Sequence, residues 1–165
     1  MVFPAPGATV VDLPDLAATG ALAAALAGQA RRGDFFGLIG GLGAGKTAFA
    51  RFFIQARGAA DEDVPSPTFT LAQVYDLPEI PVWHFDLYRI EKPGDAFELG
   101  FEDALADGIV LVEWPERLGG LLPRDRLDIQ LTFGREPDLR RASLLGHGCW
   151  AERLQAIARD LSTHA

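Results

Sequence analysis

The order of apolar and polar residues along the chain predicts helices that alternate with short buried strands. An alanine-rich stretch from Pro14 to about Ala30 carries Leu22 and Leu26 on one face and is typical of a helix. Phe35–Ile39 is a short apolar run beside glycines, which indicates a buried strand. After a glycine-rich turn, apolar residues return at helical spacing from Lys46 to Arg57. This part of the chain is therefore predicted to fold as helix, strand, turn and helix.

The remaining sequence predicts four more strands and a last helix. The strands are expected at Thr68–Tyr75, Val82–Asp86, Ile109–Glu113 and Arg126–Phe133. Because the last of these alternates apolar and polar residues, one of its faces is expected to contact water, and we place it near a sheet edge. A helical stripe of apolar residues predicts a C-terminal helix over about residues 149–161, with Trp150, Leu154, Ile157 and Leu161 facing the core.

Two segments between these elements have a different character. Ala60–Pro67 is acidic and contains prolines, so it is predicted to be a loop. Asp95–Asp107 is helical or turn-like.

Length and composition fit one globular domain. The chain has 165 residues, and single cores usually close at about 100 to 200 residues. Apolar residues make up 48% and charged residues 23%, which allows a buried core and excludes an intrinsically disordered protein. The net charge of −8 argues against a protein that coats phosphate backbones, so direct binding of nucleic acid is not expected.

The single cysteine and the absence of long apolar runs indicate the cellular compartment in which the protein is expected to work. Cys149 excludes an intramolecular disulfide and a multi-cysteine zinc site, and we expect it to pack against other residues in a reducing compartment. The first thirty residues carry no cationic stretch before an apolar run, and no segment has the ~18 unbroken apolar residues that a membrane span needs. We therefore expect a cytoplasmic protein without a membrane segment.

The glycine-rich turn carries the clearest chemical signal. Gly40, Gly45, Lys46 and Thr47 match the phosphate-loop pattern and lie between a predicted strand and a predicted helix. Glycines let backbone amides converge on phosphate oxygens, the lysine supplies a point charge, and the threonine hydroxyl can bind magnesium. Nucleotide contacts are expected from Gly40, Leu42, Gly43, Ala44, Gly45, Lys46 and Thr47.

A phosphate loop needs an acidic partner at the end of a neighbouring strand, and two carboxylates qualify. Glu113 ends the apolar run Ile109–Val112, as in a Walker B element. Asp86 ends the run that begins at Val82 and is flanked by other polar residues. The pattern alone leaves open which of them binds metal and which orients water.

The identity of the nucleotide base is indicated by motifs that the sequence lacks. A Ras-type GTPase needs an Asp-x-x-Gly after the loop and an Asn-Lys-x-Asp for guanine. The one Asp-x-x-Gly, Asp34–Gly37, precedes the loop, and Lys92 is followed by Asp95 at the wrong spacing. ATP is therefore favoured, while a small-molecule kinase remains open because kinases share the loop.

Five sequence blocks follow one another in order along the chain. They are Gly43-Ala44-Gly45-Lys46-Thr47, Ser66-Pro67-Thr68-Phe69, His84-Phe85-Asp86-Leu87-Tyr88-Arg89, Glu98-Leu99-Gly100 and Glu113-Trp114-Pro115. As a set they resemble the signatures of the TsaE family, the bacterial ATPase subunit of the tRNA threonylcarbamoyladenosine system. The resemblance covers roughly Leu13–Phe133. Gly41 stands where the family often has Asp, at a variable position of the loop.

The resemblance implies a role for each residue of the nucleotide pocket. Lys46 and Thr47 would serve the phosphates and Mg²⁺ of ATP, Glu113 would be the magnesium partner, and Asp86 would activate or position water. Thr19, on the alanine-rich helix that borders the adenine in this family, would contact the base or the ribose.

The resemblance also implies parts that respond to the nucleotide. Ser66, Pro67, Thr68 and Phe69 would form a loop that reports nucleotide state, and Trp114 would lie close to the site. Arg140 and Arg141 would reach the nucleotide, a partner or solvent.

Together these observations predict an α/β fold in which residues 1–165 form a single P-loop NTPase-like domain, with a mixed sheet flanked by helices and a nucleotide-binding core over about 13–133. The expected function is Mg²⁺-dependent binding and slow hydrolysis of ATP. The resemblance implies that this activity supports TsaD and TsaB homologues, which form threonylcarbamoyladenosine beside the anticodon of tRNA. The chain would meet tRNA only through that complex. The alternatives are a small-molecule kinase and a nucleotide-binding regulator without turnover.

One part of the catalytic machinery is not evident in the sequence. No residue stands out as an arginine finger, so we expect partners to complete the site. The segment Asp61–Phe69 is expected to be a mobile element that senses the γ-phosphate and faces a partner.

Overall fold

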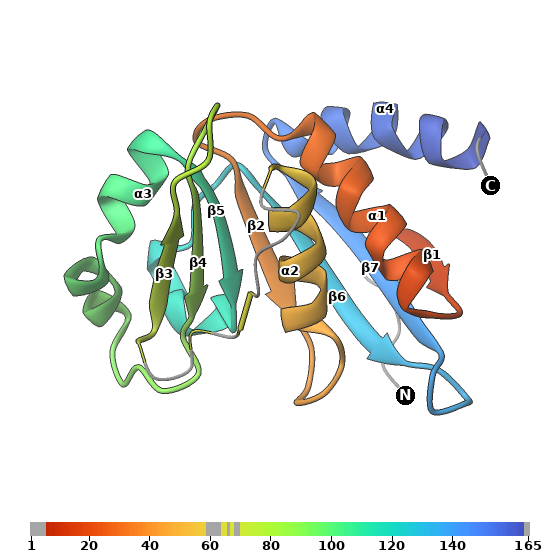
Figure 1. Ribbon diagram of the computed structural model, residues 1–165, viewed down its shortest axis with the longest axis horizontal. Coiled ribbons are helices and arrows are strands. Elements are labelled where there is room, and N and C mark those ends of the chain that lie inside the picture. The colour runs from red at the N-terminus through yellow and green to blue at the C-terminus, as the bar shows by residue number, and fades with distance from the viewer. Residues whose placement is uncertain (1–5, 59–63, 66, 68–69, 164–165) are drawn as a thin grey trace.

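A seven-stranded mixed sheet forms the centre of the molecule, in the order β1-β7-β6-β2-β5-β4-β3 (Figure 1). The structure, a computed structural model, describes residues 6–58, 64–65, 67 and 70–163. The strands are β1 (Thr9–Leu13), β2 (Phe35–Ile39), β3 (Ala72–Tyr75), β4 (Val82–Asp86), β5 (Ile109–Glu113), β6 (Arg126–Phe133) and β7 (Arg140–His147). The predicted α/β fold with a mixed sheet is confirmed.

Strand direction brings several carboxyl ends to one edge of the sheet. β2 pairs in parallel with both β5 and β6, and β5 pairs in parallel with β4. β3 is antiparallel to β4, β7 to β6, and β1 to β7. Ligand sites in open α/β sheets lie beyond the carboxyl ends of parallel strands, so the sheet itself singles out the edge at which β2, β4 and β5 end.

Helices cover both faces of the sheet. Their bounds are α1 (Leu16–Gln29), α2 (Lys46–Ala56), α3 (Phe101–Asp107) and α4 (Trp150–Thr163), with the 3₁₀ helices η1 (Pro93–Leu99) and η2 (Pro115–Leu121). In Figure 1, α1 and α2 lie in front of the sheet and α4 crosses its upper end, whereas η1, α3 and η2 pack around β3, β4 and β5. Among the described residues, none of these helices is both long enough and apolar enough to cross a bilayer.

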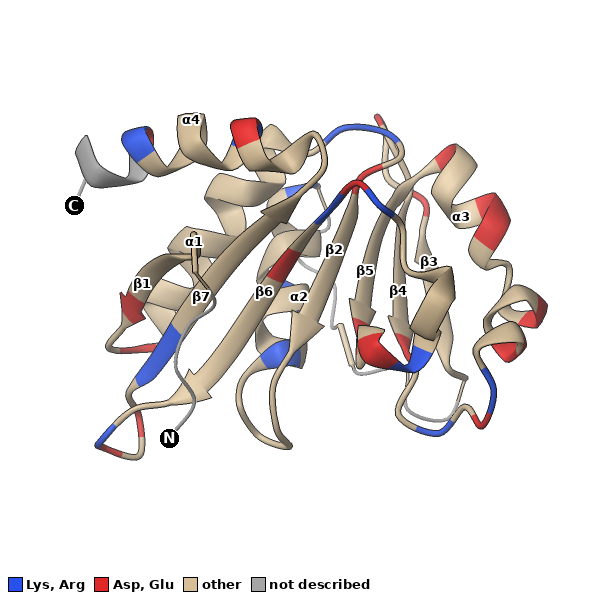
Figure 2. Cartoon of the chain, turned by 180° about the vertical axis from the view of Figure 1, so that it is seen from behind, with Lys and Arg blue, Asp and Glu red and all other residues tan. Residues whose placement is uncertain are grey.

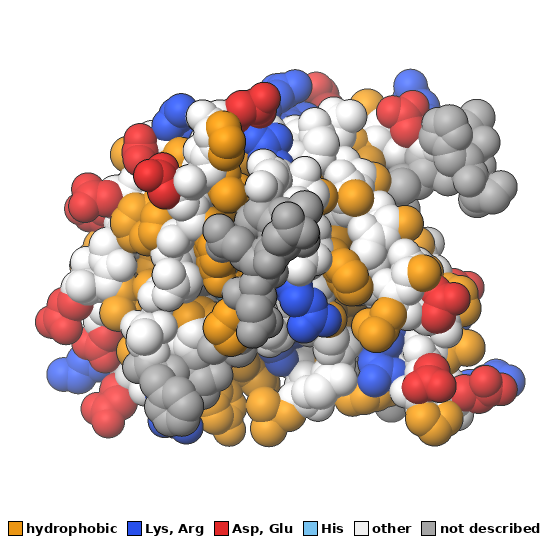
Figure 3. All heavy atoms as spheres, viewed as in Figure 1, with side chains coloured by type: hydrophobic (Ala, Val, Ile, Leu, Met, Phe, Trp, Pro, Cys, Tyr) orange, Lys and Arg blue, Asp and Glu red, His pale blue; other side chains and the backbone are white. Residues whose placement is uncertain are grey.

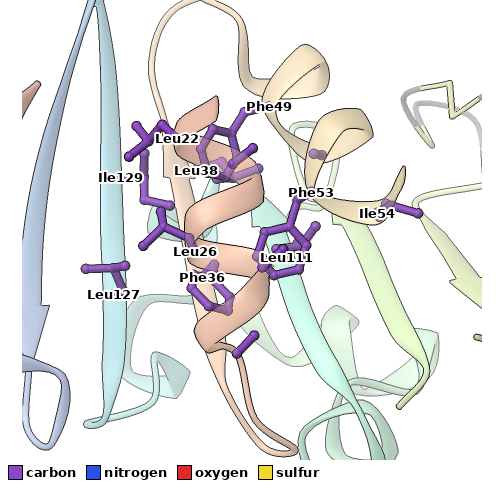
Figure 4. Close-up of a cluster of buried hydrophobic side chains, with 14 of the residues drawn as sticks. Leu22, Leu26, Phe36, Leu38, Phe49, Phe53, Ile54, Leu111, Leu127 and Ile129 are labelled. Atoms are coloured by element: carbon purple, nitrogen blue, oxygen red, sulfur yellow. The ribbon is translucent and has the colours of Figure 1, made fainter. Parts of the chain in front are cut away.

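The larger core lies between the sheet and the helices α1, α2 and α4. Figure 4 shows side chains of α1 and α2 pointing at those of β2, β5 and β6. Phe36 of β2 contacts Phe53, with ring centroids 5.1 Å apart, and Trp150, at 5.3 Å. The central strand is therefore packed against α2 and against the first turn of α4.

The helix α4 is held to the start of β2 by a partly buried ion pair. Arg153 donates two hydrogen bonds to Asp34, of 2.8 and 2.9 Å, and its guanidinium stacks 3.8 Å from the ring of Trp150. The hydrogen bond to Asp34 raises the pKa of Arg153 above its ordinary value. The predicted stripe is confirmed for Trp150, Leu154 and Ile157, which are buried; the side chain of Leu161 is outside the described part of the chain.

Acidic side chains gather on the flank formed by η1 and α3 (Figures 2 and 3). They are Asp95, Glu98, Glu102, Asp103 and Asp107. This concentration of negative charge lies to one side of the loop between β2 and α2, so it does not crowd the edge at which the parallel strands end.

Four expectations from the sequence need correction or limits. β6 is not near a sheet edge, because β7 pairs with it on the outer side and β1 extends the sheet further. β1 and β7 were not predicted at all. The strand expected over Thr68–Tyr75 begins only at Ala72; Thr70 lies in a turn, and Thr68 and Phe69 are outside the described residues. Cys149 is exposed, so its predicted packing role is wrong.

Candidate functional site

The loop between β2 and α2 depends on its glycines for its shape. A Cβ on Gly40 would lie 2.7 Å from the carbonyl oxygen of Leu131, too close for any other residue. Gly45 begins α2 from a left-handed conformation, with φ of 108°. These two glycines let the chain leave the central strand and turn at once into a helix whose first residue is Lys46.

The first turn of α2 faces the edge at which the parallel strands end. No side chain caps its amino end, so the N–H groups of that turn are open to a ligand. Open N–H groups and the helix dipole together favour an anion at this position. The sequence-predicted phosphate loop therefore has the local geometry that phosphate binding requires.

Lys46 lies against the loop itself and against Trp114. Its ammonium donates to the carbonyl oxygens of Gly40 and Gly41, the second at 3.0 Å, and lies 4.2 Å from the centre of the Trp114 ring. The side chain is only 5% exposed, and burial lowers the pKa of Lys46, although the charges of Glu113, Asp86 and Glu116 oppose that shift. A cation is thus held where a phosphate oxygen could replace its carbonyl partners.

The two acids lie side by side because β4 and β5 run in parallel with Asp86 opposite Glu113. Both side chains are buried, at 6% and 3% exposure. Asp86 accepts a hydrogen bond of 3.1 Å from the backbone N–H of Tyr88. Glu113 accepts one of 2.9 Å from the hydroxyl of Thr47, which joins the end of β5 to the first turn of α2.

Two cavities open on either side of the loop. The first, of about 570 Å³, is lined by Pro14, Asp15, Leu16, Thr19, Gly43, Ala44, Gly45, Ala48, Leu131, Asp138 and Arg140. The second, of about 470 Å³, is lined by Leu42, Gly43, Gly45, Lys46, Thr47, Ala48, Asp86, Tyr88, Arg89, Glu113 and Trp114. Gly43, Gly45 and Ala48 belong to both, so the two cavities meet across the loop and the first turn of α2.

Most of the residues predicted from the sequence line these cavities. Thr19 lies in the first cavity and Leu42, which is 72% exposed, at the rim of the second. Gly40 lines neither cavity, although its carbonyl holds Lys46. Trp114 lies in the second cavity and adopts a left-handed conformation, with φ of 62°.

The predicted switch segment is described only in part. Pro67 is buried, whereas Ser66, Thr68 and Phe69 lie outside the described residues, as do residues 61–63. The role given to this segment stays a prediction.

The two neighbouring arginines of β7 make different contacts. Arg140 lines the first cavity and donates to the carbonyl of Gly43 at 3.5 Å, with its guanidinium 4.5 Å from the Phe133 ring. Arg141 instead pairs with Asp12 of β1 at 2.9 Å and lines neither cavity. The structure therefore gives a place at the site to Arg140 alone.

Sequence reasoning missed the position of Arg89 and the contact made by His84. Arg89 lines the second cavity beside both acids, although no arginine had been named for that role. Its signal was its place three residues after Asp86 in the same sequence block. His84 contacts Glu113 with a distance of 2.7 Å between Nε2 and Oε2, a contact that only the register of β4 and β5 reveals.

Comparison with known proteins bears on this site. The family model "Threonylcarbamoyl adenosine biosynthesis protein TsaE" matches residues 13–142. The tRNA threonylcarbamoyladenosine biosynthesis protein TsaE of Bacillus subtilis is 34% identical over 147 residues, which cover 88% of this chain and 89% of that protein. The protein of the same name from Rickettsia typhi is 40% identical over 100 residues, 61% of this chain and 69% of its own.

A solved structure agrees with the fold. The crystal structure of Bacillus subtilis YdiB superposes with a TM-score of 0.77 and 27% identity, over 99% of each chain. The resemblance drawn from the five sequence blocks is confirmed by these comparisons.

Proposed function

The chain belongs to the TsaE family of threonylcarbamoyl adenosine biosynthesis proteins, and from this we propose that it binds ATP with Mg²⁺ and hydrolyses ATP slowly. In this proposal the hydrolysis supports a complex of TsaD and TsaB homologues that forms threonylcarbamoyladenosine next to the anticodon of tRNA. The observation that carries the proposal is the convergence of Lys46, Thr47, Asp86 and Glu113 in one cavity at the amino end of α2.

The two cavities suit the two ends of a nucleoside triphosphate. The first is lined by aliphatic side chains such as Leu16 and Leu131, together with Thr19, which suits a flat base and a ribose. The second is lined by the cation Lys46 and by the first turn of α2, which suits the phosphates. Because the cavities meet at Gly43 and Gly45, one ligand could cross the loop and occupy both.

The side chains at the second cavity also fit a magnesium ion. The Thr47 hydroxyl and the Glu113 carboxylate are oxygen ligands only 2.9 Å apart, and Mg²⁺ prefers one or two such protein ligands together with substrate phosphates. Among the described residues there is no cluster of three His, Cys, Asp or Glu that would hold a metal by itself. Thr47 and Glu113 would hold the ion, which when bound neutralises charge that develops on the phosphates.

Three further side chains of the cavity can each take one task in hydrolysis. Lys46 can exchange its loop carbonyls for phosphate oxygens and neutralise part of their charge. Asp86, fixed by the N–H of Tyr88, can accept a hydrogen bond from the attacking water and orient it. Arg89 is a second cation in this cavity and could stabilise charge on the transferred phosphoryl group.

The proposal assigns binding of tRNA to the partner proteins. The net charge of −8 and the acidic flank on η1 and α3 disfavour broad contact with a phosphate backbone. We propose that the protein acts in the cytoplasm, where it would work with TsaD and TsaB homologues on the modification of tRNA.

The test is phosphate release from ATP and Mg²⁺ by the chain alone and with TsaD and TsaB homologues. Turnover is expected to be slow alone and faster with the partners, and Lys46→Ala should abolish it. Lys92→Ala is the matched control, because Lys92 is the only other lysine, is exposed and lines neither cavity. Transfer of labelled phosphate to a metabolite would instead indicate a kinase. Tight ATP binding without release under either condition would indicate a regulator.

A further inference from the structure

His84 is a fully buried polar residue that contacts the candidate metal site by a hydrogen bond to Glu113. It lies on β4 with 0% exposure, on the same face of the strand as Asp86, because successive side chains of a strand alternate between faces. Its Nε2 lies 2.7 Å from Oε2 of Glu113. His84 lines neither cavity, so it would act on a ligand indirectly, and its hydrogen bond to Glu113 is a direct link to the second cavity.

The surroundings of the ring define which nitrogen carries the proton. A carboxylate can only accept hydrogen bonds, so the Nε2 of His84 must be the donor toward Glu113. The other nitrogen, Nδ1, is buried and has no hydrogen-bond partner among the described residues. A proton on Nδ1 would be left without an acceptor, which is unfavourable in a buried site. The arrangement therefore places a proton on Nε2, directed at the Glu113 carboxylate.

Glu113 is held from two sides as a result. His84 donates to Oε2 and Thr47 donates to Oε1, at 2.7 and 2.9 Å. With Oε2 fixed by the ring, the plane of the carboxylate is set, and Oε1 remains beside the Thr47 hydroxyl at the wall of the second cavity.

We propose that His84 is a positioning residue that fixes the Glu113 carboxylate so that its Oε1 and the Thr47 hydroxyl together present a ready-made pair of oxygen ligands to Mg²⁺. This inference rests on the proposed Mg²⁺-dependent binding of ATP. Hydrogen bonds that orient a metal ligand typically affect metal affinity by about 10- to 100-fold when they are removed, and this is the effect expected for His84.

The experiment measures ATP binding by calorimetry with Mg²⁺ and with EDTA, for the wild type, three variants of His84 and one control variant. In His84→Phe the ring loses its donor. In His84→Gln the side-chain amide can still reach Glu113, whereas the shorter His84→Asn cannot. Leu111→Ala is the control for lost packing, because Leu111 is buried opposite His84 in the β4–β5 register without contacting the site.

The expected result is a selective loss of the magnesium effect. His84→Phe and His84→Asn should reduce the gain in affinity on adding Mg²⁺ by about 10- to 100-fold, while binding in EDTA stays within about threefold. His84→Gln should restore most of the gain, and Leu111→Ala should keep it. Competition by Mn²⁺, followed by its electron paramagnetic resonance signal, should give the same ranking without any turnover. Should the Phe variant fail to fold, the contrast between Gln and Asn decides.

Three outcomes would count against the inference. An undiminished magnesium effect in His84→Asn would show that the ring only fills space. Equal weakening of binding with Mg²⁺ and with EDTA would show that His84 supports the pocket as a whole and not the metal ligand. A wild type whose ATP binding does not respond to Mg²⁺ would overturn the proposed function, and with it the metal role of His84; a normal wild-type response with no change in the variants would overturn the role of His84 alone.

Discussion

Replacement of Glu113 by Gln should abolish the magnesium effect on ATP binding while leaving the fold intact. The carboxylate accepts hydrogen bonds from Thr47 and from His84, and an amide has one acceptor oxygen and one NH₂ group. The glutamine can therefore lie in two orientations, with either its oxygen or its NH₂ group beside Thr47 at the candidate metal site.

The surroundings decide that choice. With the amide oxygen toward His84, the Nε2 proton keeps its acceptor, and the NH₂ group can donate to the Thr47 hydroxyl, whose own proton can rotate toward the second cavity. In the opposite orientation the ring must shift its proton to Nδ1, which has no partner. A buried N–H without a partner costs about 1–3 kcal/mol, which is a preference of about 5- to 150-fold for the first orientation. That orientation presents NH₂ where a metal needs oxygen.

Two measurements test this reasoning. Urea unfolding should show a change within about 1 kcal/mol, because no buried group of Glu113→Gln loses its partner. Calorimetry should show a loss of at least about 100-fold in the affinity gained from Mg²⁺, or about 2.7 kcal/mol. Glu116→Gln is the matched control, because it removes the same charge from an exposed residue near Lys46 that does not contact Thr47.

A double variant measures the coupling between His84 and Glu113. When His84→Phe is added to Glu113→Gln, the amide is free to turn its oxygen toward Thr47, so the two losses should not add. Additive losses in that cycle, or a magnesium effect that Glu113→Gln retains to within threefold, would refute the reasoning.

Three further predictions concern catalysis and stability. Asp86→Asn should keep ATP affinity but slow phosphate release by about 100-fold or more, measured at saturating ATP, because an amide orients water poorly and cannot take its proton; loss of affinity instead would exchange its role with that of Glu113. Arg89→Ala should lower kcat by about 10- to 1000-fold with little change in KM, and Arg89→Lys should recover part of that loss. Unchanged turnover would show that Arg89 does not stabilise the transition state and that a partner protein must supply the cation. Leu26→Ala should lower the free energy of unfolding by about 2–5 kcal/mol in urea titrations, because Leu26 is wholly buried between α1 and the sheet, whereas the exposed Leu16→Ala should change it by less than about 0.5 kcal/mol.

The central part of the fold could be predicted because its signals are local. The strand Phe35–Ile39, the glycine turn and the helix from Lys46 follow one another without interruption, and the acids end apolar runs of strand length. The elements that escaped prediction depend on distant partners. β7 begins with two arginines and contains Gly146, so its alternation is weak, and the short β1 becomes a strand only by pairing with β7.

The same distinction separates the parts of the candidate site. The phosphate loop is one continuous motif, so Lys46 and Thr47 were evident from spacing alone. The contact between His84 and Glu113 joins residues 29 positions apart and arises from the register of two parallel strands. Arg89 is an exposed side chain of a turn, and only the position of that turn beside the cavity distinguishes it from other surface arginines.

The pairing of β1 with β7 has a consequence for synthesis of the chain on the ribosome. β1 leaves the ribosome first among the strands but can enter the sheet only after β7, nearly the whole described chain later, has emerged. Until then β6 is itself the outer strand of whatever sheet has formed, with unpaired backbone groups along the side that β7 later covers. Such an edge is a site for pairing with other chains. An intermediate in which β6 has emerged and β7 has not is therefore expected to be aggregation-prone until the β6–β7 hairpin closes this edge.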